Sequence, residues 1–136
     1  MINFIFLEYM KTILVDAVQT FVIEGEGINQ EMYAMLEEYD NPKIIVTNAN
    51  DEQILAYSLD DMPYDVFTLK HEPDKTDPQY FVTLLETFDL EAEDVLYFEH
   101  TPGAVRAAQS VGIVSQWYDP DAQDIEEIRM FIDENL

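Results

Sequence analysis

The sequence contains no cysteine and few basic residues, and both absences narrow what the protein can be. Without cysteine, a disulfide framework, a thiolate metal site and a cysteine nucleophile are excluded, and the composition is compatible with a reducing cytoplasm, the location we expect. The chain has only 6 lysines and arginines but 29 aspartates and glutamates, which gives a formal net charge of −23. Because nucleic acids and anionic membranes repel such a surface, we expect neither as a partner.

The N-terminal segment lacks the marks of a targeting or membrane-spanning sequence. Glu8 interrupts its apolar run, and neither a basic start nor a small-residue cleavage site is present. We predict an N-terminal extension over residues 1–10, packed on a sheet edge or on another chain. Residues 11–136 show no repeat, low-complexity tract or linker, so we predict a single domain there.

Short β-rich apolar runs alternate with longer segments of helical period, which is typical of an α/β fold. We predict a Rossmann-like three-layer sandwich: a mainly parallel five-stranded sheet covered by helices on both faces, with the first strand central. The predicted strands are residues 12–15, 44–47, 66–69, 95–98 and 113–116. The predicted helices are residues 30–39, 52–57, 78–88, 102–111 and 122–134.

Several of these helices carry start signals. Asp77 and Thr101 each place a capping side chain before a proline, and Asn50 with Gln53 resembles a capping box. The helix N-termini are therefore expected near the strand carboxyl ends, where their partial positive charge can meet an anion. Residues 20–27, with two glycines after an apolar run, predict a small hairpin or flap, and an ordinary strand-to-helix loop is the alternative.

Polar residues follow the first and fourth predicted strands, where ligands of open parallel sheets bind. Asp16 ends the first strand, and Glu99 with His100 follows the fourth. Taken alone, Asp16 is as well explained as a turn former that caps the following loop. His71 and the acidic clusters at 91–94 and 119–127 are interpreted as solvated surface, and Trp117 as a packing residue with the site rim as the alternative.

Four segments, in order, resemble the motifs of the haloacid dehalogenase (HAD) superfamily of phosphatases and phosphotransferases. Residues 12–20 resemble the strand that ends in Asp-x-Asp-x-Thr/Val, and residues 44–48 resemble the strand that ends in Thr or Ser. Residues 75–81 are similar to the Lys-Pro-x-Pro-x-x-Phe segment, and residues 95–113 resemble the acidic metal loop and its following helix. Together these segments span roughly residues 11–118.

The resemblance implies a role for each matching residue. Asp16 takes the nucleophile position, while Thr47, Asn48 and Lys75 take the phosphate-holding positions. Metal ligands would come from Asp16, the backbone carbonyl of Val18, and the Glu99-His100 pair. The chemistry is reasonable in itself, because a carboxylate can form an acyl-phosphate and phosphoryl transfer needs a positive field. Read singly, Lys75 could equally be a solvated lysine and Thr47 a helix-entry hydroxyl.

Two departures from the motifs bear on activity. Val18 stands where the phosphatases carry a second aspartate, and it can neither protonate a leaving group nor activate water, a contribution of about 10²–10⁴-fold in rate. His100 stands at the metal aspartate, and imidazole is a poor ligand for Mg²⁺. We therefore expect weak Mg²⁺ binding, with Zn²⁺ or Mn²⁺ through His100 as the alternative cofactor.

The short intervals between the four segments leave no room for a cap domain, so the site should be open. Two functions follow. One is a HAD-type phosphohydrolase or phosphotransferase, with weak or lost activity, acting on a phosphorylated small molecule or macromolecule. The other is a non-catalytic HAD-like domain that binds a protein partner or a ligand. A homo-oligomer, in which a neighbouring subunit closes the site, is a further expectation.

Overall fold

The sheet has the predicted architecture. The computed structural model describes residues 10–136, so residues 1–9, nearly all of the predicted extension, lie outside the described part of the chain. Five parallel strands form a sheet of order β5-β4-β1-β6-β7, with β1 in the centre. Their bounds are β1 Thr12–Asp16, β4 Lys43–Thr47, β5 Asp65–Thr68, β6 Val95–Glu99 and β7 Val114–Trp117.

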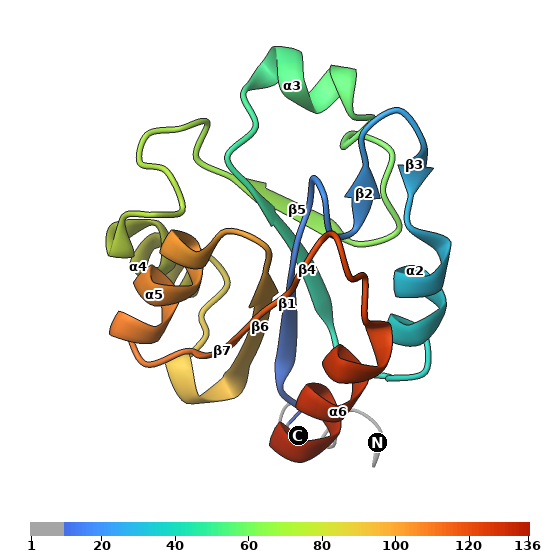
Figure 1. The fold of residues 1–136 in the computed structure, drawn as a ribbon. Coiled ribbons are helices and arrows are strands. Elements are labelled where there is room, and N and C mark those ends of the chain that lie inside the picture. The colour runs from blue at the N-terminus through green and yellow to red at the C-terminus, as the bar shows by residue number, and fades with distance from the viewer. Residues whose placement is uncertain (1–9) are drawn as a thin grey trace, which may run out of the picture.

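Helices cover both faces of the sheet, which makes three layers (Figure 1). On one face lie α4 (Pro78–Thr87) and α5 (Pro102–Ser110), and on the other lie α2 (Gln30–Leu36) and α6 (Ile125–Asn135). The short helix α3 (Asp51–Ala56) stands beyond the carboxyl edge of the sheet and buries none of its side chains (Figure 1). A single 3₁₀ turn, Ala92–Asp94, precedes β6. No cap domain occurs within residues 10–136.

Strand alternation decides which side chains reach the site. Ile13 and Val15 of β1 pack in the core under α2 and α6, whereas Leu14 packs in the core under α4 and α5. Since successive side chains point to opposite faces, Asp16 shares the face of Leu14. In β6, Glu99 likewise shares the face of Tyr97. Two carboxylates from neighbouring strands therefore end on the same face of the sheet.

The segment after β1 forms the predicted hairpin rather than an ordinary loop. Strands β2 (Val22–Ile23) and β3 (Gly27–Ile28) pair in antiparallel fashion. Gly25 and Gly27 have φ angles of +82° and +89°, in the left-handed region that glycine enters at little cost. The hairpin stands beside α3 above the carboxyl edge of the sheet (Figure 1).

Some predicted boundaries and one predicted cap were wrong. Helix α6 begins at Ile125, three residues later than expected, because the Asp124 side chain accepts a hydrogen bond from the Glu127 amide and caps it there. Helix α2 ends at Leu36 instead of continuing to residue 39. Thr101 makes no side-chain cap at α5, and its backbone N–H is instead donated to Glu99.

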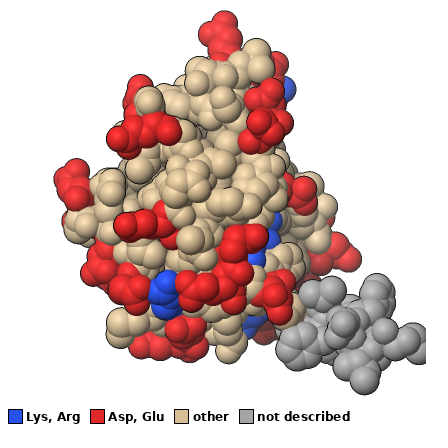
Figure 2. Space-filling model, turned by 90° about the vertical axis from the view of Figure 1, so that its right-hand side faces the viewer, with Lys and Arg blue, Asp and Glu red and all other residues tan. Residues whose placement is uncertain are grey.

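Acidic side chains cover much of the face drawn in Figure 2, where lysines and arginines are few. Arg129 is paired with Glu126 and Glu38. Ion pairs also engage Lys43, Lys70 and Lys75, so four of the six basic residues are paired with carboxylates. Among residues 10–136, no helix is long and apolar enough to cross a membrane.

Candidate functional site

An open hollow of about 280 Å³ lies at the carboxyl edge of the sheet. Its walls come from the ends of β1, β4 and β6, the loop before α4, and α3. The structure therefore brings together four residues from the four motif segments: Asp16, Thr47, Lys75 and His100. The lining also includes Val18, Gln19, Asn48, Ala49, Gln53, Tyr57, His71 and Thr101.

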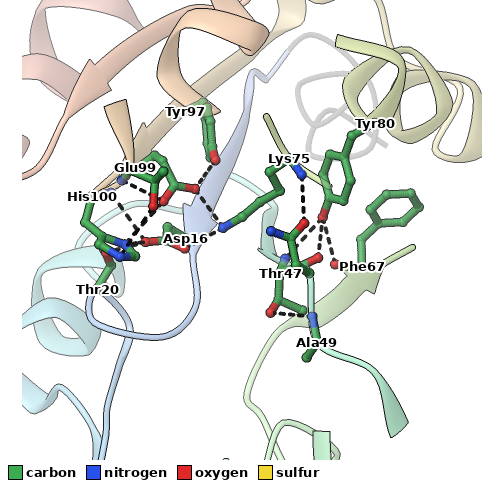
Figure 3. A network of polar contacts seen from close by, with 12 residues as sticks. Asp16, Thr20, Thr47, Ala49, Phe67, Lys75, Tyr80, Tyr97, Glu99 and His100 are labelled. Atoms are coloured by element: carbon green, nitrogen blue, oxygen red, sulfur yellow. Dashed lines mark hydrogen bonds and ion pairs between the residues drawn. The ribbon is translucent and has the colours of Figure 1, made fainter. Parts of the chain in front are cut away.

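Asp16 is fully engaged by its neighbours (Figure 3). Its Oδ1 lies 2.7 Å from the Lys75 ammonium. Its Oδ2 accepts a hydrogen bond from the Thr20 hydroxyl at 2.7 Å and is also paired with Nδ1 of His100. The backbone N–H of His100 approaches Oδ2 at 3.4 Å. The carboxylate is buried, and donors meet both of its oxygens.

Glu99 is fully buried, and donors from neighbouring residues meet both of its carboxylate oxygens as well. Its Oε1 lies 2.7 Å from the Lys75 ammonium and also accepts the hydroxyl of Tyr97. Its Oε2 accepts the backbone N–H of Thr101 at 3.0 Å and lies 3.3 Å from Nδ1 of His100. Lys75 and His100 thus each bridge the two carboxylates (Figure 3).

These pairings hold the groups in their charged forms. Burial alone would raise the pKa of Asp16, but the Lys75 charge and the His100 hydrogen bond hold it well below its usual range. Burial alone would lower the pKa of Lys75, and the charges of Asp16 and Glu99 raise it above its usual range instead. Hydrogen bonds to Asp16 and then Glu99 raise the pKa of His100 to about 9, which favours the protonated ring.

Lys75 is itself oriented by the predicted phosphate-holding segment. The side-chain oxygen of Asn48 accepts the Lys75 backbone N–H at 2.7 Å, which ties the loop before α4 to the end of β4. Thr47 precedes Asn48, and its hydroxyl oxygen accepts the Ala49 N–H at 3.2 Å. The Thr47 hydroxyl proton and the Asn48 amide group remain suited to a ligand in the hollow.

Several site residues were missed by the sequence reasoning. Thr20 and Tyr97 support the two carboxylates, and Tyr80 joins the ends of β4 and β5 through the backbones of Thr47 and Phe67. Strand alternation would have placed Tyr97 beside Glu99, because both lie on the same face of β6. Thr20 carried a weaker signal, as the last residue of the first motif segment.

His71 is exposed, as expected of a solvated surface residue, and it also lines the hollow. Its Nδ1 lies 2.8 Å from Asp74 and its Nε2 lies 2.8 Å from Gln53. Trp117 is exposed, and its indole N–H is donated to the backbone carbonyl of His100 at 2.8 Å. The predicted packing role is therefore wrong, because Trp117 belongs to neither core cluster and instead contacts the loop that carries His100.

The predicted metal ligands are close together, but their arrangement does not suit Mg²⁺. Ligand atoms of Asp16, Glu99 and His100 lie within 4.8 Å of one another, and Val18 lines the same hollow. Mg²⁺ requires several hard oxygen ligands in near-octahedral geometry. Here a protein donor meets every oxygen of the two carboxylates, and an imidazole nitrogen lies between them. A Mg²⁺ ion would have to displace the His100 side chain.

No protein-family model and no curated protein matches the chain. Solved structures do resemble it. A HAD-superfamily hydrolase from Ehrlichia chaffeensis matches with TM-score 0.59 and 17% identity, over 81% of this chain and 62% of that one. The core domain of a candidate phosphoglycolate phosphatase from Streptococcus pneumoniae matches with TM-score 0.57 and 17% identity, over 91% of this chain and 96% of that one.

A third structure in this group is a HAD-family enzyme from Bacteroides thetaiotaomicron, an aspartate-to-alanine variant in complex with magnesium and inorganic phosphate. It matches with TM-score 0.53 and 14% identity, over 69% of this chain and 55% of that one. The chain thus spans somewhat more than half of the two HAD enzymes and nearly all of the isolated core domain. At such identities the likeness establishes the fold. The chain has the HAD-type α/β fold of these structures.

Proposed function

We propose that this protein is a capless HAD-type phosphohydrolase or phosphotransferase domain over residues 11–136, in which Asp16 is the nucleophile and turnover is weak. The observation that carries this proposal is the convergence of Asp16, Thr47 and Lys75 around one open hollow at the carboxyl edge of the sheet. The same fold in the core domain of a candidate phosphoglycolate phosphatase supports phosphorylated compounds as its substrates.

The chemistry assigns each residue a task. An Asp16 carboxylate oxygen attacks phosphorus, the bond between phosphorus and the ester oxygen breaks, and the alkoxide leaves with a proton from water. Water then cleaves the aspartyl-phosphate and releases inorganic phosphate. Lys75, the Thr47 hydroxyl and the Asn48 amide hold the phosphoryl oxygens and offset their charge. Because Val18 supplies no proton, the leaving group depends on solvent, and the rate is low.

The open rim of the hollow affects the size of the substrate that can reach Asp16. The hollow is uncapped, with α3 and the β2-β3 hairpin beside it, and a phosphorylated macromolecule can reach Asp16 as readily as a small molecule. Closure by a second copy of the chain is an alternative way to exclude water. A cytoplasmic location remains a prediction from the cysteine-free composition.

The choice of divalent metal ion depends on the ligand atoms that Asp16, Glu99 and His100 offer. Magnesium in the phosphate complex of the Bacteroides enzyme makes Mg²⁺ the first ion to test. The place of His100 between the two carboxylates predicts a weak response to it. Zn²⁺ or Mn²⁺ through the imidazole remains the alternative.

Turnover of a panel of phosphate monoesters, with Mg²⁺, Mn²⁺ or Zn²⁺, tests the proposal. Asp16→Asn removes the nucleophile and is expected to lower any turnover by about 10³-fold. Asp60→Asn makes the same change at an exposed position and is expected to leave turnover unchanged. Turnover that survives Asp16→Asn would show that Asp16 is not the nucleophile.

The second candidate is a non-catalytic HAD-like domain that binds a protein partner or a ligand. Two features favour it: the apolar Val18 in the hollow, and the saturated hydrogen bonding of Asp16, which leaves its oxygens poorly prepared to attack. A phosphate-ester panel without turnover, together with phosphate binding that depends on Lys75, would support this second function.

A further inference from the structure

The Gln53 side chain on α3 is held in one orientation by its neighbours. Its oxygen Oε1 accepts the Asn50 backbone N–H at 2.9 Å, which closes the capping box at the start of the helix. Nε2 of His71 also lies 2.8 Å from Oε1. Since a backbone N–H can only donate, the side-chain oxygen must face Asn50, and the amide nitrogen is turned away from these partners.

The amide nitrogen is the free end of the Gln53 side chain. It has no hydrogen-bond partner within residues 10–136, and Gln53 lines the same hollow as Asp16 and Lys75. Two N–H donors therefore remain for a ligand. The contacts of Oε1 fix the amide before any ligand arrives, so binding does not have to order this side chain.

Gln53 lies on a different wall of the hollow from the phosphate-holding residues. Thr47 and Asn48 are at the end of β4, next to the end of β1, whereas α3 stands beyond the carboxyl edge of the sheet (Figure 1). In phosphoryl transfer, the leaving oxygen lies roughly in line with the attacking oxygen, on the opposite side of phosphorus. A leaving group displaced by Asp16 therefore points out of the sheet edge, toward the wall that carries Gln53.

The size and charge of the hollow restrict what this leaving group can be. The volume of about 280 Å³ is at the lower end of ligand pockets, and a bound phosphoryl group leaves room for only a few further atoms. The Gln53 amide is neutral, and the whole chain carries a net charge of −23. A second anionic group would be repelled by this charge, so a neutral oxygen acceptor suits the two donors best.

We propose that Gln53 is a specificity-determining residue that binds a neutral oxygen of the leaving group, so that the substrates are small phosphomonoesters whose alcohol carries a hydroxyl or carbonyl group near the ester oxygen. The proposal deepens the proposed function and rests on it for the position of the phosphoryl group. The Gln53 amide donates its N–H groups to the leaving-group oxygen. A phosphomonoester of a purely hydrocarbon alcohol makes no such bond and binds more weakly.

Titration of the full chain with glycerol 3-phosphate and with propyl phosphate, in millimolar Mg²⁺, tests the proposal, because these esters differ only in two hydroxyl groups. Calorimetry is expected to give a Kd about three- to tenfold lower for glycerol 3-phosphate, the effect of one or two neutral hydrogen bonds. In a proton–nitrogen spectrum of the labelled protein, the Gln53 side-chain amide signal is expected to shift with glycerol 3-phosphate and to move much less with propyl phosphate.

Gln53→Glu separates the donor role from the helix cap. The carboxylate keeps an oxygen for the Asn50 N–H but loses both donors, so the preference for glycerol 3-phosphate is expected to fall below about twofold. Gln19→Glu is the matched control, because Gln19 is the other glutamine that lines the hollow and lies on the turn after β1. It adds the same charge to the hollow and is expected to keep the preference, although the added charge weakens phosphate binding in both variants.

Three results would overturn the proposal while inorganic phosphate still binds: equal Kd values of the wild type for the two esters, a Gln53 signal that does not respond to glycerol 3-phosphate, or a preference that survives Gln53→Glu. Should Gln53→Glu fail to fold, the two wild-type measurements still decide. The proposed function fails differently. If neither inorganic phosphate nor any ester binds or is turned over, the phosphoryl site is disproved, and the leaving-group contact is disproved with it.

Discussion

The two sides of the hollow are built differently. The carboxylate side consists of Asp16, Glu99, Lys75 and His100, and the first three are buried, with a protein donor at every carboxylate oxygen. The open side consists of Thr47, Asn48, Gln53 and His71. It lies on the end of β4, on α3 and on the loop before α4, and α3 buries none of its side chains.

The contrast separates two kinds of polar group. On the carboxylate side, charges are compensated within the protein. Removal of one charged side chain therefore leaves its partner buried and uncompensated. On the open side, polar groups face a hollow that water or a ligand can fill, so single losses are offset by solvent. We expect global stability to depend strongly on the carboxylate side and only weakly on single polar groups of the open side. Four substitution or titration experiments test this division.

The largest effect is expected from Lys75→Met, which keeps the length of the side chain but removes its charge. Two buried carboxylates then share His100 alone, and we expect the free energy of unfolding to fall by about 3–5 kcal/mol. Urea denaturation followed by circular dichroism measures this loss. Lys70→Met is the control, since Lys70 is exposed and pairs with exposed Asp51 at the surface, where about 0–1 kcal/mol is expected. Equal, small losses in both variants would contradict the division.

The pH dependence of stability tests the same side through His100. Its pKa is raised from 6.5 to about 9 in the folded state, chiefly by the hydrogen bond to Asp16. Folding therefore favours the protonated ring, and this stabilisation is complete below the unfolded pKa and is lost as the pH rises through about 9. Because the side chain is partly exposed, we expect a loss of about 1–3 kcal/mol.

Denaturation of the wild type and of His100→Asn between about pH 6 and pH 9.5 measures this dependence. The neutral amide of the variant cannot lose a proton, so its stability is expected to be flatter over the same range. A wild type and a variant with the same slope would show that His100 is not the titrating group.

Much of the fold was predictable from the sequence, because the apolar pattern of a segment is also what drives it to form a strand or a helix. Apolar runs of four or five residues alternate with helical segments, and Asp16 and Glu99 directly follow such runs, which places them at the carboxyl edge. The hairpin was predicted from two glycines after an apolar run, and in the structure both glycines have φ angles in the left-handed region. Lys75 was placed only through the order of the motif segments, because nothing in its local sequence indicates that it reaches the sheet centre.

The remaining contacts depend on loop paths that no local pattern encodes. His71 lies on a loop where both Lys70 and His71 have positive φ angles, a path that brings its ring against Gln53 on α3. Thr101 looked like a helix cap, but its N–H is donated to Glu99. The saturation of the carboxylate side depends on side chains from three different segments, and only the folded chain brings them together.

An intermediate effect is expected from Tyr80→Phe, under the open side. The buried hydroxyl accepts the Thr47 N–H at 3.1 Å and faces the carbonyl oxygens of Thr47 and Phe67 at 2.8 Å and 3.1 Å. Its removal leaves buried backbone groups unpaired, and we expect a loss of about 1–2 kcal/mol in urea denaturation. Tyr33→Phe, at a partly exposed tyrosine of α2, should cost at most about 0.5 kcal/mol. A loss for Tyr80→Phe as large as that for Lys75→Met would place the open side, too, among the stability determinants.

The smallest global effect is expected from Asn50→Ala at the start of α3. The Asn50 side chain accepts the Gln53 N–H at 3.0 Å, and the Gln53 side chain accepts the Asn50 N–H at 2.9 Å, a complete capping box. Its loss is expected to lower the local stability of α3 by about 1 kcal/mol. This corresponds to a roughly fivefold faster amide exchange within the helix.

Because α3 fully buries no side chain and contacts the core only through the partly buried Ile54, this local opening should proceed without global unfolding, and the urea midpoint should change little. Asn29→Ala is the matched comparison. Asn29 caps α2 through the Met32 N–H, and α2 buries Met32, Met35 and Leu36 in the core, so the same loss of a cap should lower global stability there. If Asn50→Ala shifted the urea midpoint as much as Asn29→Ala, α3 would be coupled to the core, and the open side would be part of the cooperative fold.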